Sequence, residues 1–152
     1  MPRANPTLQQ GPISIRRLDS ITALKAAHKV MAELRPHLDL QQFLVLVQEM
    51  RGEGYRVAGL FDGGTLRAVA GYRVLTMLVR GRSLYVDDLV TTAEMRGKGY
   101  GKLLLDWLMR EARRQRCNEF HLDSGVQRFA AHAFYFSRGL HIASYHFATG
   151  LK

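Results

Sequence analysis

The sequence Arg96-Gly97-Lys98-Gly99-Tyr100-Gly101 places three glycines at alternate positions between two segments with regular hydrophobic patterns. An apolar, strand-like run over residues 83–91 precedes it, and an amphipathic run typical of a helix follows over residues 102–116. Alternate glycines at a strand-to-helix turn leave backbone N–H groups uncovered at the positive end of a helix dipole. Lys102 adds to the positive charge of Arg96 and Lys98. We therefore predict an anion-binding loop over residues 96–102, and a pyrophosphate is the anion that it would take most readily.

Two families of phosphate-binding loop do not fit the spacing of these glycines. A P-loop ends in Gly-Lys-Ser/Thr, whereas Lys102 is followed by Leu103. A dinucleotide-binding fingerprint needs a third glycine three places after the second, and neither Lys102 nor Leu104 supplies it. Asp123 does stand about 20 residues on, where a ribose-binding acid would lie. However, the loop begins two-thirds along the chain, which leaves too few residues for a doubly wound sheet.

The loop and its neighbours resemble three parts of the GNAT superfamily of acetyl-CoA-dependent N-acetyltransferases. Residues 96–101 are similar to the glycine loop of its motif A, and residues 85–91, Tyr-Val-Asp-Asp-Leu-Val-Thr, resemble its fourth strand. Residues 131–140 resemble its motif B, an alanine-rich helix with a tyrosine four residues before a Gly-Leu end. The resemblance is specific over residues 84–140 and only topological before them. It implies an α/β GNAT (acyl-CoA N-acyltransferase) fold, with helices on both faces of a mixed, mostly antiparallel, splayed sheet.

Hydrophobic periodicity and turn residues predict the order β-α-α-β-β-β-α-β-α-β. Strands are expected over residues 13–18, 55–61, 66–78, 83–91, 119–123 and 141–148. Helices are expected from residue 21 to before Pro36, from Asp39 to residue 51, and over residues 102–116 and 127–138. Asp39 and Gln42 have the spacing of a capping box. The strands between residues 55 and 91 read as an antiparallel meander with turns at residues 62–64 and 80–82.

Composition indicates one compact enzyme domain. The 152 residues are 47% hydrophobic, so a flexible arm over residues 1–12 and a single domain over residues 13–152 are expected. No apolar run reaches membrane-spanning length, and the lone Cys117 suits a reducing compartment, so we expect a cytoplasmic protein without a membrane partner. We attribute the net charge of +9 mainly to a solvated basic surface, which would also attract an anionic cofactor. The alternative explanation of this charge is a basic nucleic-acid-binding module. No histidine or cysteine pair has metal-ligand spacing, so no metal is expected.

The resemblance implies transfer of an acetyl group from acetyl-CoA directly to a primary amine in a ternary complex. The glycine loop would hold the pyrophosphate of coenzyme A. Backbone groups freed by a bulge in the fourth strand would hold the pantetheine arm and the thioester oxygen. The expected cofactor-binding residues are Leu89, Val90, Thr91, Arg96, Gly97, Lys98, Gly99, Tyr100, Gly101 and Lys102.

Two catalytic residues are carried over from the family by position. Asp87 stands where polyamine-acetylating members carry an acid, and it is the expected base for the amine, directly or through water. Strand alternation would place Asp87 on the face of Leu89 and Thr91, and Asp88 on the opposite face in a structural pair. Tyr135 stands at the position of the family's general acid, and a phenol of pKa near ~10 is able to donate a proton at neutral pH.

Several points depart from the family pattern or stay open. Arg128 stands where many members carry a cofactor-supporting Asn, so that role is not carried over. Only residues 140–152 follow Gly139, so one last strand is expected, and a homodimer in which another subunit completes the sheet edge stays open. The acceptor is undetermined, although acids such as Asp123 and Glu94 near the site favour a small cationic amine. A catalytically silent acyl-CoA-binding sensor is the main alternative function.

Overall fold

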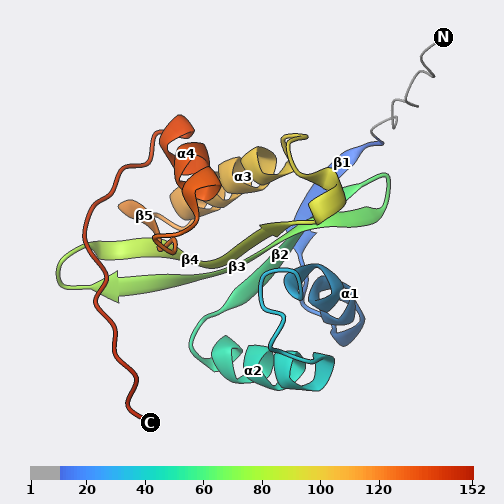
Figure 1. The fold of residues 1–152 in the computed structure, drawn as a ribbon, viewed down its shortest axis with the longest axis horizontal. Helices are drawn as coiled ribbons and strands as arrows, with labels where there is room; N and C mark the ends of the chain where they lie inside the picture. The colour runs from blue at the N-terminus through green and yellow to red at the C-terminus, as the bar shows by residue number, and fades with distance from the viewer. Residues whose placement is uncertain (1–10) are drawn as a thin grey trace.

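The computed structural model describes residues 11–152, so the expected N-terminal arm lies, apart from Gly11 and Pro12, outside the described residues. The elements follow one another from β1 to α4 (Figure 1). They are β1 (Ile13–Arg17), α1 (Ile21–Met31), α2 (Leu40–Gly52), β2 (Arg56–Asp62), β3 (Thr65–Met77), β4 (Gly81–Thr91), the short 3-10 helix η1 (Ala93–Met95), α3 (Tyr100–Arg114), β5 (Glu119–Leu122) and α4 (Phe129–Ser137).

The five strands form one sheet in the order β1-β2-β3-β4-β5. The first four strands are antiparallel to their neighbours, which confirms the predicted meander, and β5 runs parallel to β4. Helices α1 and α2 lie on one face of the sheet, and α3 and α4 lie on the other (Figure 1). This mixed, three-layered α/β arrangement is the one that the sequence predicted.

Local signals set the starts of the first two helices. The Ser20 hydroxyl accepts a hydrogen bond from the backbone N–H of Ala23 at the start of α1. Asp39 and Gln42 form the predicted capping box, with a 2.8 Å bond to the Gln42 N–H and a 3.0 Å bond from the Asp39 N–H. Each such cap is worth about 1 kcal/mol. Along residues 11–152, no helix combines the length and apolar character needed to cross a membrane.

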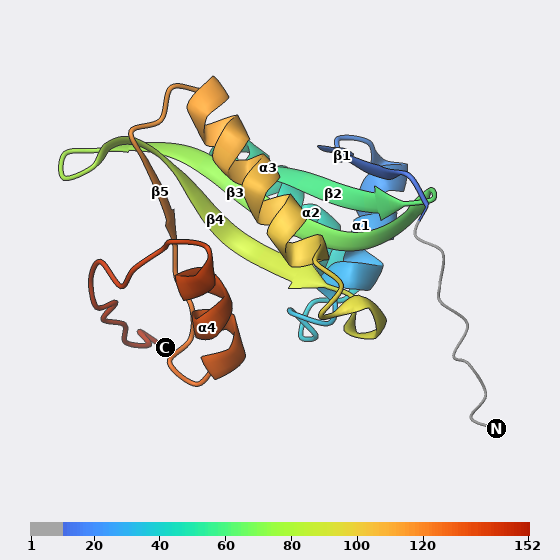
Figure 2. The same cartoon turned by 90° about the horizontal axis from the view of Figure 1, so that it is seen from above.

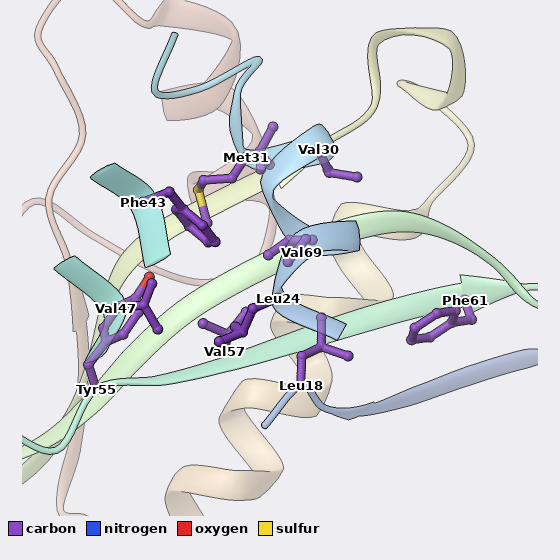
Figure 3. Close-up of a cluster of buried hydrophobic side chains, with 12 residues drawn as sticks. Leu18, Leu24, Val30, Met31, Phe43, Val47, Tyr55, Val57, Phe61 and Val69 are labelled. Atoms are coloured by element: carbon purple, nitrogen blue, oxygen red, sulfur yellow. The ribbon is translucent and has the colours of Figure 1, made fainter. Parts of the chain in front are cut away.

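The core consists of two layers, one on each face of the sheet. Side chains of α1 and α2, such as Leu24 and Phe43, pack on one face (Figure 3). Side chains of α3, among them Leu104, pack on the other. Because strand side chains alternate, Val69 belongs to the first layer and Ala70 to the second. The central strands are therefore buried on both sides, which explains their nearly continuous apolar sequence.

The pairing of β4 with β5 stops halfway along β4. The parallel register ends at Val86 opposite Leu122, whereas β4 continues for five more residues to Thr91. Figure 2 shows β5 diverging from β4 toward α4. Over residues 87–91, β4 therefore has β3 on one side and, within residues 11–152, no strand on the other. This is the splay of the sheet that the resemblance implied.

The prediction of a last strand over residues 141–148 is wrong for the single chain. Residues 141–152 have no regular structure and are exposed throughout. A strand exists only through hydrogen bonds to a neighbouring strand, and along residues 11–152 no strand pairs with this segment. The alternating sequence is that of a segment able to pair with a strand, but no described strand of the same chain pairs with it.

Boundaries of several other elements differ from expectation by a few residues, as α1 and α3 illustrate. Helix α1 ends at Met31 in a turn rather than running to Pro36. Helix α3 begins at Tyr100, inside the glycine loop, and ends at Arg114 because Arg116 adopts the left-handed conformation at φ 58°.

Replacing Leu104 by Ala tests whether the α3 layer holds the fold together. Leu104 is fully buried, so the cavity should lower the free energy of unfolding by about 2–5 kcal/mol in urea denaturation. Its neighbour Leu103 is 40% exposed, and Leu103→Ala should cost less than about 1 kcal/mol. Equal losses for the two variants would contradict the assigned packing of α3.

Candidate active site

The glycine loop has the backbone geometry of an anion cradle. Gly97 and Gly99 adopt positive φ values of 79° and 85°, which favour glycine. Gly99 is the N-cap of α3 and provides no side-chain cap. Among the described residues, no acceptor receives a hydrogen bond from the backbone N–H groups of residues 96–102. Because these donors lie at the positive end of α3, the loop can bind an anion.

The side chains of the loop divide into exposed cations and one buried anchor. Lys98 and Lys102 are exposed, and Arg96 lies 3.7 Å from Glu33 with most of its side chain in solvent. Tyr100, by contrast, is only 1% exposed, and its hydroxyl donates a hydrogen bond to Asp62. Only the backbone of Tyr100 therefore remains available to a ligand, so its side chain is not part of the cradle.

Three sequence segments meet at Gly101. A Cβ atom at this position would lie 3.7 Å from the Thr91 hydroxyl oxygen and 3.7 Å from the ring of Phe134. An ion pair of 2.8 Å between Arg138 and Asp106 fixes α4 against α3. The end of β4, the glycine loop and α4 are thus adjacent, as the resemblance implied. Figure 2 shows α4 beside the part of β4 that lacks a strand neighbour.

A β-bulge lies in β4 at Asp87. On β3, Gly71 faces Asp88 and Tyr72 faces Val86, so Asp87 has no partner residue. The following residues 89–91 return to regular pairing with β3. Since β5 has already diverged, no strand in the described part of the chain lies along the outer edge of these three residues. The N–H and C=O groups that point outward there can bond a ligand.

The Asp87 carboxylate is held by Arg73 through two hydrogen bonds of 3.1 and 2.8 Å. Arg73 also donates to Glu53 at 3.1 Å, so it bridges two acids. Burial raises the pKa of Asp87 above its usual range, and the hydrogen bonds and charge of Arg73 partly offset this rise. The carboxylate is mostly buried, with 19% of the side chain exposed, and it is paired with the guanidinium of Arg73.

The Asp88 carboxylate forms the structural pair expected for it, with Arg35 at 2.9 Å and the Tyr55 hydroxyl at 2.7 Å. The expectation that Asp87 and Asp88 point to opposite faces is wrong. Both carboxylates contact residues on the side of α1 and α2, whereas Leu89 packs in the layer beneath α3. The bulge explains the difference, because an extra residue interrupts the alternation of side chains along a strand.

Tyr135 lies on α4, next to the Phe134 ring that contacts the loop, with 5.4 Å between the two ring centroids. The side chain is half-buried, and burial raises the pKa of Tyr135 above its ordinary value. The phenol is therefore protonated at neutral pH. Arg128 precedes α4 and gives the helix no side-chain cap.

The acidic character of the site is weaker than the sequence suggested. Asp87 and Asp88 are each matched by an arginine, and Glu94 is exposed outside this network. Asp123 is half-exposed and accepts a 2.5 Å hydrogen bond from the Tyr85 hydroxyl. Among residues 11–152, no three His, Cys, Asp or Glu side chains gather in a way that could hold a metal ion.

Sequence reasoning missed the arginines that surround these carboxylates. Arg73 lies opposite Tyr85 in the β3–β4 ladder, so it could have been found once the register was known. Arg35 lies 53 residues before Asp88, and nothing in the local sequence signals the contact.

Comparison with known proteins identifies what this arrangement is similar to. A sequence model of the acetyltransferase (GNAT) family matches residues 21–140. The uncharacterized N-acetyltransferase YhdJ of Bacillus subtilis (strain 168) is 36% identical over 137 residues, which cover 89% of this chain and 96% of that protein.

Solved structures share the fold at lower identity. The aminoglycoside N-acetyltransferase AAC(6')-Iy in complex with CoA superposes with a TM-score of 0.81 at 14% identity, covering 91% of this chain and 94% of that chain. The ribosomal-protein-alanine N-acetyltransferase of Brucella melitensis biovar Abortus 2308 gives 0.79 at 18% identity, covering 92% and 100%. At these identities the likeness concerns the fold alone.

Replacing Arg73 by Met tests the electrostatic role assigned to this residue. An adjacent arginine lowers an aspartate pKa by about 1–3 units, so the pKa of Asp87 should rise by at least about one unit when Arg73 is removed. A carboxyl carbon NMR titration measures this directly, and Arg113→Met on the exposed side of α3 is the matched control. An unchanged pKa in Arg73→Met would show that the ion pair does not act on Asp87.

Proposed function

Because the chain belongs to the acetyltransferase (GNAT) family, we propose that it moves the acetyl group of acetyl-CoA directly to a primary amine in a ternary complex. Family membership and the 36% identical N-acetyltransferase make it an N-acetyltransferase, an enzyme that transfers acyl groups. The observation that carries the finer proposal is the uncapped glycine loop beside the open edge of β4.

The loop fits the pyrophosphate of acetyl-CoA. A Cβ atom at Gly97 or Gly99 would meet nothing within 4 Å, so the space above the loop is open to a ligand. The free N–H groups of residues 96–102 would bind the phosphate oxygens, and the exposed Lys98 and Lys102 would add charge. We therefore assign acetyl-CoA as the cosubstrate on the strength of this donor set.

The pantetheine arm would lie along the outer edge of residues 89–91. Backbone groups there have no strand neighbour, so they can pair with the amides of the arm as a strand would. An N–H group aimed at the thioester oxygen would stabilise the negative charge that develops on it during transfer. Donors fixed in this way are worth roughly 3 kcal/mol.

Asp87 is the proposed base for the acceptor amine. An alkylammonium has a pKa near ~10, so a base must remove a proton before the nitrogen can attack. The two hydrogen bonds from Arg73 leave lone pairs on Asp87 free, because a carboxylate has about four acceptor sites. Asp87 would take the proton directly or through one water, and its pKa, raised by burial, makes it a better base than an exposed aspartate.

Tyr135 is the proposed acid for the departing thiolate of coenzyme A. Its position on α4 beside Phe134, which contacts the loop at Gly101, supports a place near the reacting sulfur. The raised pKa keeps the phenol protonated, as a donor requires.

The acceptor is proposed to be a small cationic amine. Asp123, half-exposed and hydrogen-bonded by Tyr85, supports a cationic acceptor. The arginine partners of Asp87 and Asp88 reduce the attraction for a highly charged polycation. Two proteins that share the fold are named for acceptors as different as an aminoglycoside and a ribosomal-protein alanine. The fold by itself therefore does not determine which amine is the acceptor. The free Cys117 thiol supports a reducing compartment, for which we propose the cytoplasm.

Calorimetric titration with acetyl-CoA tests the cofactor assignment. Wild-type protein should bind one equivalent, and Gly99→Glu should weaken binding by at least about a hundredfold, because it strains the loop and adds a like charge. Gly64→Glu is the matched control, since Gly64 has φ 84° and open surroundings in the β2–β3 turn. Normal binding by folded Gly99→Glu would show that the loop is not the cradle. Binding without amine-dependent thiol release, for any amine, would support the silent sensor.

Tyr135→Phe tests the acid. Loss of the hydroxyl should lower kcat by about 10²–10⁴ while the Kd for acetyl-CoA stays within about threefold. Tyr145→Phe, in the exposed C-terminal segment, should leave both quantities unchanged. A normal kcat in Tyr135→Phe would remove this residue from the mechanism.

A further inference from the structure

Gly71 lies inside β3, opposite Asp88 and next to the bulge of β4. A glycine within a strand is destabilising relative to alanine. The φ of Gly71 is not positive, so its backbone conformation does not require glycine. A Cβ atom here would lie 1.8 Å from the Tyr55 hydroxyl oxygen and 2.7 Å from a carboxylate oxygen of Asp88. The missing side chain therefore makes room for a contact between these two residues.

That contact is a hydrogen bond of 2.7 Å, which the Tyr55 hydroxyl donates to the Asp88 carboxylate. Tyr55 directly precedes β2 and belongs to the core layer beneath α1 and α2, where it is 2% exposed (Figure 3). Burial, and to a smaller extent the charge of Asp88, raises the pKa of Tyr55 above its ordinary value. The hydroxyl is therefore a permanent donor at neutral pH.

Arg35 connects the Asp88 carboxylate to the backbone of the bulge. Its guanidinium donates to the other oxygen of this carboxylate at 2.9 Å and to the backbone C=O of Asp87 at 3.2 Å. Asp87 has no partner residue on β3, so contacts of this kind, rather than the ladder of the sheet, fix its backbone. A continuous series of hydrogen bonds therefore runs from Tyr55 to the main chain at the bulge.

The ring of Tyr55 supports the side chain of Asp87 as well. The Arg73 guanidinium lies 5.6 Å from the centroid of this ring, within the range of a cation–π attraction. Arg73 in turn donates the two hydrogen bonds that hold the Asp87 carboxylate. One buried side chain thus serves both acids, because its hydroxyl binds Asp88 and its ring contacts the arginine that binds Asp87.

We propose that Tyr55 is a positioning residue for the proposed base. Its hydroxyl, admitted by Gly71, fixes Asp88. Through Arg35, Asp88 then fixes the backbone at Asp87. This role rests on the proposed function, in which Asp87 takes the proton of the amine. At 2% exposure Tyr55 is out of reach of a substrate, so it acts only through the residues that it holds. A displacement of about 1 Å in a reacting group can cost about a hundredfold in rate, which is why such a support matters.

NMR relaxation dispersion on the ligand-free protein tests whether Tyr55 holds the bulge. Tyr55→Phe removes the hydroxyl and keeps the ring beside Arg73, so the amides of residues 86–88 should show microsecond-to-millisecond exchange that the wild type lacks. Tyr72→Phe is the matched control, because Tyr72 is buried in the α3 layer and its hydroxyl has no hydrogen-bond partner in the described part of the chain. Amides without exchange in Tyr55→Phe, or equal exchange in the two variants, would overturn the proposal.

Gly71→Ala breaks the same contact while both of its partners stay in the chain. The added methyl group would occupy the position of the Tyr55 hydroxyl, so exchange at residues 86–88 should appear here too. Gly59→Ala on β2 is the control for crowding, because its Cβ atom would instead crowd the apolar side chain of Leu66 at 2.6 Å. A folded Gly71→Ala without exchange would count against the role given to the missing side chain. If Gly71→Ala does not fold, the result for Tyr55→Phe decides alone.

The kinetics of acetyl transfer test the consequence for Asp87. The assay uses acetyl-CoA with the alkylamine, amino-acid amide or aminoglycoside that gives the fastest thiol release in the wild type. Tyr55→Phe should lower kcat at least about tenfold, because the base is no longer held in place. The Kd for acetyl-CoA should stay within about threefold, because residues 89–91 keep their pairing with β3. In an Asp88→Ala background, Tyr55→Phe should lower kcat by less than about a further twofold, since it acts through Asp88.

The outcomes separate the positioning role from the proposed function. An unchanged kcat in Tyr55→Phe, or a further loss of about tenfold in the Asp88→Ala background, would contradict the positioning role. A wild type that releases no thiol with any of these amines would refute the proposed function instead. The relaxation data on the ligand-free protein would then still decide whether Tyr55 holds the bulge.

Discussion

The candidate site depends on one interruption of the sheet, the point where β5 leaves β4 after Val86. Up to that point β4 is a buried central strand, with a neighbour on each side. Beyond it, the same strand keeps β3 but presents its other edge to a ligand. The glycine loop follows directly after this open stretch, and α4 closes it from the side of β5. A fully paired sheet would bring the same side chains together but would leave no backbone groups to bind an extended substrate.

The bulge at Asp87 lies next to this interruption, and its effect is on the face of the sheet that α1 and α2 cover. It turns two successive carboxylates toward α1 and α2, where Arg73 and Arg35 hold them. The cradle lies at the start of α3, on the other face of the sheet. A substrate that enters beside β4 would therefore have the N–H groups of the glycine loop on the α3 side of the sheet. The carboxylates of Asp87 and Asp88 would lie on the side of α1 and α2.

The sequence predicted those features that local chemistry decides. The loop rests on glycine conformation, the capping box on the Asp39–Gln42 spacing, and the meander on alternation and turn residues. The features it missed depend on distant partners. Arg35 reaches Asp88 across 53 residues, and the bulge that puts both acids on one face follows from the β3–β4 register. Residues 141–148 have a strand pattern, but a pattern cannot state whether the chain contains a partner for it.

Tyr100 has a further consequence for the glycine loop. A loop rich in glycine is usually mobile, and ordering it on binding a ligand has a large entropic cost. Here the side chain in the middle of the loop is inserted in the core and hydrogen-bonded to Asp62 on β2. The positive-φ glycine just before it is thereby joined to a fixed point of the sheet. The loop is thus held in place before any ligand binds, so an anion bound there would meet donors already in position, and little binding free energy would be lost to ordering the backbone.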